Sequence, residues 1–486
     1  EGTWQLSKNE KHPQEMTTII YNATIVTLDN EDQVMQGAMV FDNKQILAIG
    51  NFEELKQKYQ DAKLIDADER VVFPGFVNAH GHYYGMFSRG MDTKDTPAKD
   101  FEEVLQKLWF RLDRCLDEAS VRLSAKVCLL DALSAGTTTI VDHHASPNYI
   151  QNSLKAIYEE TKKAGIRSSL CYEVTDRNGE EQMKMGVKEN LDFMRYAAQQ
   201  QEEAVKQGQT PDIQGQFGLH ALLTCSDETL KYCNQELKQV IKEIGLHGGF
   251  HLHVTEGIAD QIRSVERYQA RVVERLCKYL FNGIDQSKTL LAHCIDLSDE
   301  DIKQLSELNL KIVHNPSSNM NNAVGVTKVN KMLENGIQLC LGTDGMNSDM
   351  ILEHKTLYLL HKHNQKDPGA FSVQAYEMLK NNGKFATQLF GGQKIGVIEV
   401  GAVPDIVITK YRNPTPMNRF NIPWHIMFGM QPGCAWYTIC QGKVLVQEGN
   451  IVSMNPKQVQ KEAQKETPNV WGRLDGIISF DKKKQE

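Results

Sequence analysis

The sequence lacks the paired cysteines that mark disulfide frameworks and zinc ribbons. Its ten cysteines include no Cys-X-X-Cys pair, and they lie mainly inside apolar segments such as Lys126–Ala132 and Gln338–Leu341. Such surroundings are typical of buried free thiols, which persist in a reducing compartment. We therefore expect a cytoplasmic protein.

Long apolar runs and clusters of positive charge are also missing. No apolar run reaches the roughly 18 residues that a membrane span requires, and the N-terminus has no secretory apolar core. The formal net charge is −8, and the one locally basic stretch, 482–484, lies at a terminus, where charge is usually solvated. Because nucleic acids and acidic membranes bind concentrated positive charge, we expect neither as a partner.

What is present is the composition of an ordinary folded protein. The chain has 486 residues, of which 41% are hydrophobic and 24% charged. This length permits about two to four domains, or one large α/β barrel with an accessory module. Residues 1–15 are polar and begin without methionine, whereas Met16 opens a strand-like pattern. We expect residues 1–15 to be a disordered extension or a tag remnant.

Short alternating strands occupy both ends of the chain. Residues 16–72 contain the strand patterns Ile19–Leu28 and Ala38–Ile49, separated by polar turns. Similar patterns return in residues 391–455, at Asp405–Thr409, Trp436–Cys440 and Lys443–Val452. Neither flank alone could bury much apolar area, so one small β-sandwich module built from both chain ends is favoured over two independent fragments. Residues 456–486 would follow as a C-terminal tail.

The middle of the chain, residues 73–390, repeats a strand-then-helix cycle. Phe101–Leu116 has apolar residues at helical spacing, and Ser298 with Asp301 forms a capping-box pattern that predicts a helix start. Eight cycles predict a (β/α)₈ TIM barrel, with a doubly wound open sheet as the alternative. The eight candidate strands are Val72–His82, Thr137–His144, Ile166–Thr175, Ile213–Leu222, Gly248–Glu256, Thr289–Asp296, Lys311–Ser318 and Ile337–Gly345.

A pair of histidines ends the first of these strands. The segment 74–82 reads Pro-Gly-Phe-Val-Asn-Ala-His-Gly-His, so His80 and His82 are two residues apart. In a strand such residues point to the same face roughly 6–7 Å apart, close enough to converge on one ion. The alternative for an isolated pair is two unconnected histidines in the core or in solvent.

Titratable side chains also end nearly every other candidate strand. In a barrel the C-terminal ends of all strands meet at one face, which is where this architecture places its chemistry. Any one of these residues alone could be a hydrogen-bonded structural residue, but their joint distribution favours a shared site. Besides His80 and His82 they are His143, His144, Glu173, His220, His251, His253, Glu256, His293, His314 and Asp344.

Taken in order, these motifs resemble the amidohydrolase superfamily over roughly residues 17–455. The resemblance is to its mononuclear branch, which holds cytosine and guanine deaminases, methylthioadenosine/adenosylhomocysteine deaminases and s-triazine hydrolases. It is carried by segments 74–82, 253–256 (His-Val-Thr-Glu), 291–293 (Leu-Ala-His) and 342–345 (Gly-Thr-Asp-Gly). Closer still, segments 142–147, 171–177 and 217–220 resemble the SsnA group of aminohydrolases.

The resemblance implies one divalent metal, held by His80, His82, His253 and Asp344. Neutral imidazoles and a carboxylate suit zinc, which is the first expectation, or ferrous iron. A bound ion would lower the pKa of a water molecule from about 15.7 toward about 7. Binuclear members of the superfamily use a carboxylated lysine at a middle strand end, and no strand end here offers a lysine. Dihydroorotase-like or hydantoinase-like chemistry is therefore disfavoured.

The resemblance also implies three catalytic residues. Glu256 would take a proton from water and deliver it to a ring nitrogen of the substrate. His293 would orient the attacking water or polarise the substrate, and Asp344 would ligate the metal and accept a proton. The alternative for Glu256 is a surface carboxylate at the start of the next helix, where the helix dipole favours acids.

Candidate substrate-binding residues rest on weaker signals. His220 matches a substrate-contacting position in deaminases of this branch, and four residues are candidates by location alone: His143, His144, Glu173 and Arg177. His251 shares a strand face with His253, but the family's ligand stands three residues before the glutamate, so His251 is expected to line the barrel. His314 is expected to be structural.

The predicted function is a metal-dependent aminohydrolase that replaces an exocyclic amine on a purine-like heterocycle with oxygen and releases ammonia. One alternative is a triazine-type chlorohydrolase or amine hydrolase, and another is a non-catalytic barrel scaffold. A role in selenium metabolism is associated with the SsnA group, but no residue here explains it. The resemblance further implies a homodimer or a larger homo-oligomer.

Overall fold

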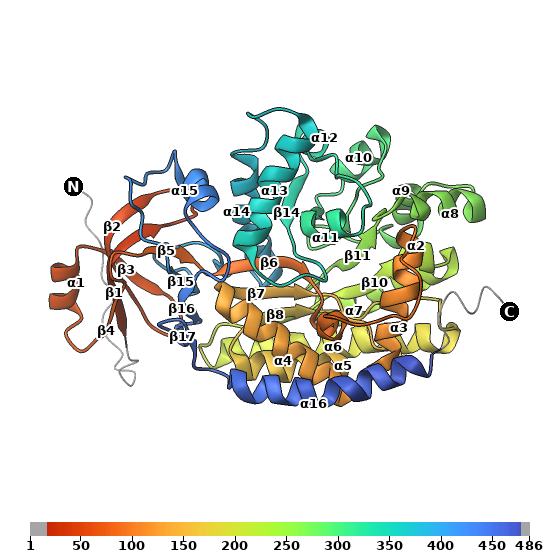
Figure 1. Cartoon of the computed structure of the whole chain (residues 1–486), viewed down its shortest axis with the longest axis horizontal. Coiled ribbons are helices and arrows are strands. Elements are labelled where there is room, and N and C mark those ends of the chain that lie inside the picture. Colours follow the sequence, from red (N-terminus) through yellow and green to blue (C-terminus); the bar gives the residue numbers. More distant parts are fainter. Residues whose placement is uncertain (1–16, 478–486) are drawn as a thin grey trace.

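A mixed β-sheet at one end of the molecule joins the two ends of the chain. The computed structural model describes residues 17–477, and in these residues β5 pairs in parallel with β1 and antiparallel with β15. The order is β18-β17-β16-β15-β5-β1-β2-β3, with β4 also on β1. The labelled strands β1–β5 and β15–β17 lie together at one end of the molecule in Figure 1. The strands are β1 (Thr18–Val26), β2 (Val34–Phe41), β3 (Ile46–Gly50), β4 (Lys63–Asp66), β5 (Val71–Pro74), β15 (Ile406–Thr409), β16 (Ala435–Cys440), β17 (Lys443–Gln447) and β18 (Asn450–Ile451).

Two parallel sheets fill the middle of the molecule. One has the order β6-β7-β8-β9 and the other β10-β11-β12-β13-β14. Isolated bridges join them at both edges, between Gly81 and Asp344 and between Val174 and Leu219. The strands are β6 (Phe76–Gly81), β7 (Thr137–Asp142), β8 (Arg167–Leu170), β9 (Ile213–Gly215), β10 (Phe217–Ala221), β11 (Phe250–Val254), β12 (Leu290–His293), β13 (Lys311–His314) and β14 (Gln338–Leu341).

Two of the predicted strands are each divided between two sheets. The predicted strand Val72–His82 breaks at Gly75, so that β5 joins the mixed sheet and β6 the parallel one. A side chain at Gly75 would lie 2.3 Å from Thr138 Oγ1, which is why the crossing needs glycine. The predicted strand Ile213–Leu222 breaks at Gln216, where the chain changes its partner from β8 to β11.

Helices cover the outside of the parallel sheets. The predicted helix start at Ser298 is confirmed, because Ser298 Oγ accepts a hydrogen bond from the Asp301 amide at 3.1 Å and the Asp301 side chain accepts one in return from the Ser298 amide. The main helices are α4 (Glu118–Ala135), α5 (Ser153–Ala164), α6 (Glu180–Lys206), α7 (Asp227–Ile244), α8 (Ile258–Tyr268), α10 (Asp299–Ser306), α11 (Pro316–Asn321), α12 (Val329–Glu334), α13 (Met350–Gln365) and α14 (Gln374–Leu389). Other helices are α1 (Phe52–Lys58), α9 (Val272–Arg275), which runs into a π-helical turn (Leu276–Leu280), and α15 (Ile422–Phe428).

The C-terminal region contains a long helix where a tail was expected. Helix α16 (Pro456–Asp475) lies along α4 (Figure 1), and Lys126 of α4 pairs with Glu462 of α16 at 3.1 Å. Val459, Val470 and Leu474 bury one face of α16 against the same apolar cluster as α4. The extension predicted for residues 1–15 and the basic stretch 482–484 lie outside the described residues.

The predicted helix Phe101–Leu116 is irregular. It runs as α2 (Phe101–Val104), a π-helical turn (Leu105–Trp109), α3 (Phe110–Leu112) and a 3₁₀ turn (Asp113–Cys115), with a separate 3₁₀ turn (Tyr83–Ser88) just after β6. A π-helical turn adds a residue to the helical repeat and changes which side chains share a face. The apolar side chains of this segment therefore point both into the core and over the strand ends.

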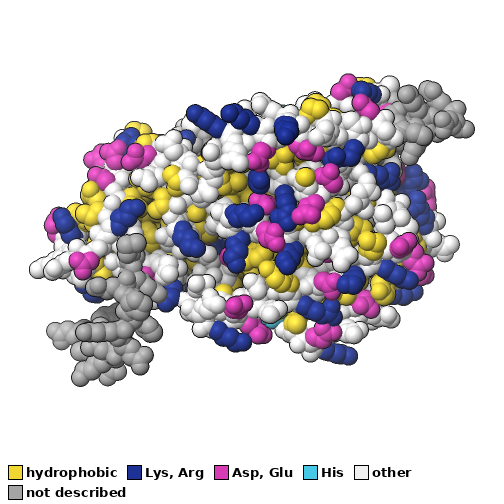
Figure 2. Space-filling model, turned by 90° about the horizontal axis from the view of Figure 1, so that it is seen from below, with side chains coloured by type: hydrophobic (Ala, Val, Ile, Leu, Met, Phe, Trp, Pro, Cys, Tyr) yellow, Lys and Arg dark blue, Asp and Glu magenta, His cyan; other side chains and the backbone are white. Residues whose placement is uncertain are grey.

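Charges of both signs are interspersed on the face of the molecule shown in Figure 2. Among the described residues, no helix is long and apolar enough to cross a membrane.

Candidate metal centre and active-site pocket

Four side chains from three strand ends meet at one point. His80 belongs to β6 and His82 follows it, His253 belongs to β11, and Asp344 follows β14. One ligand atom from each lies within 4.8 Å of the others. The amides of Thr343 and Asp344 donate hydrogen bonds to the His80 carbonyl at 3.0 and 2.9 Å, which fixes the end of β14 beside β6.

The donor atoms of this cluster fit a divalent metal. Asp344 Oδ1 lies 3.1 Å from His80 Nε2 and 2.8 Å from His82 Nε2. His253 Nε2 is buried and has no hydrogen-bond partner among the described residues. Buried polar nitrogens are almost always paired, so an unpaired one aimed at a carboxylate and two imidazoles indicates a ligand position. Imidazoles with a carboxylate suit zinc or ferrous iron.

The second nitrogen of His82 sets its tautomer. His82 Nδ1 lies 2.5 Å from the backbone oxygen of His143, and a carbonyl oxygen can only accept. Nδ1 must therefore carry a proton, and Nε2, which faces Asp344, is the nitrogen that can bind a metal once its own proton is lost. Metal-binding histidines commonly use their far N–H in this way.

The electrostatics of the cluster are set by burial and by two carboxylates. Burial lowers the pKa of His80 to about 3. Burial also acts to lower the pKa of His82, but Asp344 and Glu173 raise it to about 9. Burial would raise the pKa of Asp344, yet its close contacts with the His80 and His82 rings hold that pKa well below its usual value. Without an ion, His82 thus carries a proton that metal binding would release.

Glu256 stands beside the cluster and is held by an amide. Thr255 has a φ of 46°, and this turn at the end of β11 directs Glu256 toward the cluster. Asn322, just after α11, donates a hydrogen bond to Glu256 Oε1 at 3.1 Å. Glu256 Oε2 lies 3.4 Å from His293 Nε2. Burial and the nearby Asp344 raise the pKa of Glu256 well above its usual value, so this carboxyl holds a proton readily.

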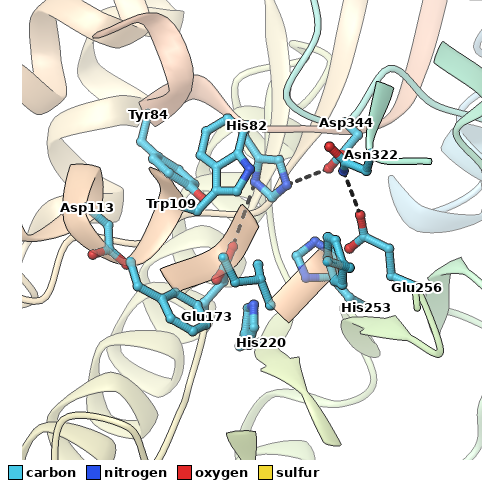
Figure 3. Close-up of a pocket in the computed structure, with 13 residues that line it drawn as sticks. His82, Tyr84, Trp109, Asp113, Glu173, His220, His253, Glu256, Asn322 and Asp344 are labelled. Atoms are coloured by element: carbon cyan, nitrogen blue, oxygen red, sulfur yellow. Dashed lines mark hydrogen bonds and ion pairs between the residues drawn. The ribbon is translucent and has the colours of Figure 1, made fainter. Parts of the chain in front are cut away.

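Three residues of the cluster, His82, His253 and Asp344, line a pocket of about 420 Å³ (Figure 3). Tyr84 and Trp109 stand on one side of the pocket in Figure 3, with Asp113 farther out, and Phe110 is a third aromatic residue of the lining. This arrangement combines a flat apolar wall with acidic groups, as a planar polar ring requires. The remaining lining residues are Phe101, Leu105, Glu173, His220, Glu256 and Asn322.

Two of the five predicted substrate-binding residues line this pocket. His220 lies 2.7 Å from the Thr224 hydroxyl through Nδ1, and that hydroxyl donates to the Ala221 carbonyl. Nδ1 of His220 therefore carries the proton, and Nε2 is left as an acceptor. Burial would raise the pKa of Glu173, but His143, at 3.0 Å, and His220 and His82 lower it to about 2. Glu173 is thus an ionised carboxylate within the pocket.

The other three lie outside it. His143 Nε2 lies 3.0 and 3.1 Å from the backbone oxygens of Leu219 and His251, so it ties strands together beneath the pocket. His144 Nε2 lies 2.8 Å from the Ser146 hydroxyl. Arg177 pairs with Asp113 and stacks on the Phe110 ring at 4.1 Å. It lines an adjoining outer cavity of about 1100 Å³.

Sequence reasoning missed several residues that line the pocket or contact the metal cluster. Asn322 and Ser318, whose hydroxyl donates to Asp344 Oδ2, belong to the polar run after β13. That run, Asn-Pro-Ser-Ser-Asn-Met-Asn-Asn at 315–322, was the available signal. Trp109 and Phe110 carried no such signal, because their positions depend on the π-helical turn.

The fold and the cluster together describe an α/β protein with a candidate site for a divalent metal. The amidohydrolase family matches residues 71–445 by sequence. The chain belongs to the amidohydrolase family. It is 31% identical over 464 residues to a 5'-deoxyadenosine deaminase of Methanosarcina mazei, covering 94% of this chain and 99% of the relative. It is 29% identical over 438 residues to a 5-methylthioadenosine/S-adenosylhomocysteine deaminase of Thermococcus sibiricus, covering 89% and 94%.

Solved structures with the same fold include two zinc-bound proteins. An adenosine deaminase from Xanthomonas campestris superposes with a TM-score of 0.77 at 18% identity, covering 96% of this chain and all of that one. An atrazine chlorohydrolase from Arthrobacter aurescens superposes with a TM-score of 0.73 at 17% identity, covering 93% and all of that chain. At these identities the likeness concerns the fold. The finer resemblance to the SsnA group stays a prediction.

Proposed function

We propose that this protein is a metal-dependent aminohydrolase acting on a purine-like heterocycle. In the reaction the bond between a ring carbon and its exocyclic amine breaks, a bond from that carbon to the oxygen of water forms, and the amine leaves as ammonia. The observation that carries the proposal is the cluster of His80, His82, His253 and Asp344 directly beside Glu256 on a pocket floor. The names of the two relatives above, both purine-nucleoside deaminases, support the choice of ring.

The metal is proposed to be a single divalent ion, zinc before iron. When bound, such an ion would lower the pKa of a coordinated water molecule to about 7. Zinc is favoured because the donor set is three imidazoles and one carboxylate, and because zinc is bound in the two structural neighbours. The same donors also suit ferrous iron, so metal analysis must decide.

Glu256 is proposed to carry a proton between water and the ring. Its raised pKa suits a group that accepts the proton of water and delivers it to the ring nitrogen beside the amine-bearing carbon. Asn322 holds one oxygen of Glu256, which leaves the other free for the transfer. His293 and Asp344, within 4.8 Å of Glu256, would orient the attacking water and accept its second proton.

The substrate ring is proposed to lie against Trp109 and Phe110. His220 Nε2 and the Glu173 carboxylate are both acceptors, so they would bind hydrogen-bond donors of the substrate. His143 is proposed to act through Glu173, and Arg177 through Asp113 and Phe110, rather than by touching the ring. His144, which bonds to Ser146, is proposed to support the wall behind Tyr84.

We further propose that the two parallel sheets are halves of one closed (β/α)₈ barrel. The bridges at both sheet edges support closure, and β9 with β10 would then count as one strand. The proposed division is residues 73–390 for the barrel, with 16–72 and 391–455 forming the β module, for which a sandwich was predicted. The shared mixed sheet supports joining the two flanks.

Self-association and a cytoplasmic location are proposed on separate grounds. Phe420 and Phe428, at either end of α15, are 72% and 75% exposed, and Trp424 between them is 38% exposed. Exposed aromatic side chains grouped in this way favour contact with a second copy of the chain, which light scattering on a Phe428→Ser variant would test.

The proposed cytoplasmic location rests on the cysteines. All ten lie among the described residues and are free, which favours a reducing compartment.

The test is metal analysis joined to an ammonia-release screen. Purified protein is assayed with purine nucleosides, free purines, pyrimidines, pterins and triazines. The proposal expects about one ion per chain and ammonia release from an amino-purine. A fully metal-loaded protein that released ammonia from none of these compounds would refute it. Release of ammonia or of chloride from triazines alone would favour the triazine-hydrolase alternative.

A further inference from the structure

The nitrogen of His80 that faces away from the metal cluster begins a chain of hydrogen bonds. His80 Nδ1 lies 2.8 Å from His251 Nε2. His251 Nδ1 lies 3.6 Å from Cys171 Sγ, and that sulfur lies 3.5 Å from the backbone oxygen of Asp142. The three side chains are fully buried, so bulk water does not compete for these contacts.

The last acceptor fixes the direction of every bond in the chain. A carbonyl oxygen only accepts, so the Cys171 thiol donates its single proton to Asp142. The sulfur is then left to accept from His251 Nδ1–H. A neutral histidine carries one ring proton, so His251 Nε2 is a lone pair that accepts from His80 Nδ1–H. His80 Nε2 is thereby left unprotonated, facing Asp344.

We propose that His251 is a positioning residue that holds His80 in its metal-binding tautomer, with the Cys171 thiol as the end of the chain. The proposal rests on the metal centre of the proposed function. It assigns His251 a role beyond lining the barrel, although His251 does not line the pocket and is not one of the four residues of the metal cluster. Outer hydrogen-bond partners of this kind typically contribute about 10- to 100-fold to metal affinity.

A comparison with the neighbouring ligand supports this assignment. His82 reaches a backbone carbonyl directly, through Nδ1 to the oxygen of His143. His80 reaches one only through His251 and Cys171. In both histidines, therefore, the proton sits on Nδ1 because that nitrogen is connected by hydrogen bonds to a backbone carbonyl oxygen. Nε2 of each ring is thereby left to bind the metal. If the chain ran the other way, His80 Nε2 would carry a proton toward Asp344 Oδ1, 3.1 Å away, and could not bind metal.

Variants separate the hydrogen bond from simple packing. His251→Leu removes the acceptor, whereas His251→Gln keeps an oxygen that His80 Nδ1–H can reach. Cys171→Val keeps the volume but not the acceptor, and Cys171→Ser keeps a donor and an acceptor. Cys233→Val, at an equally buried thiol in α7, is the matched control.

The first readout is zinc affinity, measured by competition with a chelator. We expect His251→Leu to lose about 10- to 100-fold and Cys171→Val to lose in the same direction. We expect His251→Gln, Cys171→Ser and Cys233→Val to stay near the unsubstituted protein. Equal affinity in His251→Leu and His251→Gln would overturn the proposal.

The second readout needs no destabilising variant. Long-range proton–nitrogen correlation spectra of ¹⁵N-histidine-labelled, zinc-loaded protein report which ring nitrogen carries the proton, with His251→Gln identifying the signal. We expect His251 protonated at Nδ1 and unprotonated at Nε2, and the reverse would overturn the proposal. Failure of the proposed function is distinguishable, because it would appear as zinc-loaded protein that releases no ammonia while the tautomer is as expected.

Discussion

Replacing Glu256 by glutamine isolates the proposed proton carrier from its surroundings. Glu256 Oε1 accepts from Asn322 at 3.1 Å, and the glutamine oxygen can accept the same bond. The glutamine amide would then face His293 Nε2, which lies 3.4 Å from the present Oε2. Glu256 is not among the four residues of the metal cluster. The substitution therefore removes the transferable proton and leaves packing and metal binding in place.

The size of the loss follows from the role. A positioned general acid–base group typically contributes about 10²- to 10⁴-fold to the rate. At about 1.36 kcal/mol per tenfold, this corresponds to about 2.7–5.4 kcal/mol of transition-state stabilisation. In the proposed role Glu256 transfers protons and does not bind the ring at rest, so we expect the loss in kcat, with KM little changed.

The assay is ammonia release from a 5'-deoxyadenosine-type substrate, with zinc content measured on the same samples. Glu266→Gln is the matched control, since Glu266 lies on α8 and is exposed. We expect the control to match the unsubstituted protein. Glu256→Gln protein with full zinc and more than a tenth of the original kcat would refute the reasoning.

Three further predictions follow from named contacts. His253→Ala removes a buried ligand nitrogen that has no other partner, so we expect loss of bound zinc by mass spectrometry of metals, whereas His247→Ala, at a histidine outside the cluster, should keep it. Trp109→Ala removes one face of the aromatic wall, and an aromatic contact of about 0.5–1.5 kcal/mol predicts a KM raised about 2- to 13-fold; an unchanged KM would place the ring elsewhere. Burial lowers the pKa of His354 to about 3, so between pH 6.5 and that value the unfolded chain binds a proton that the folded chain does not. The free energy of unfolding therefore falls by up to about 1.4 kcal/mol for each pH unit by which the pH is lowered through this range. His354→Leu should flatten the decline of the melting temperature between pH 6.5 and 5, and an equal decline in both proteins would contradict this.

Much of the site could be predicted because its residues end strands. His80, His253 and His293 each end or nearly end a buried strand, and parallel strand ends gather at one edge. Their types then indicate metal and proton chemistry. The helix start at Ser298 could also be predicted, because its capping box depends only on two side chains three residues apart in the sequence.

The rest depends on contacts between distant segments. The breaks at Gly75 and Gln216 follow from which neighbouring strand each half meets, and a continuous apolar pattern does not record that change. The spacing of apolar residues in 101–116 predicted a regular helix packed on the strands. The π-helical turn that brings Trp109 to the pocket is too short to produce a recognisable repeat of apolar residues in the sequence. Arg177 was placed by proximity to a strand end, whereas its stacking on Phe110 draws it to the outer cavity.

The most direct test of the account is ammonia release by one preparation in three states: as purified with its metal, after removal of metal by a chelator, and after zinc is restored. The account predicts activity toward an amino-purine nucleoside in the first state, loss in the second and recovery in the third at about one zinc per chain. Undiminished ammonia release from metal-free protein would contradict it.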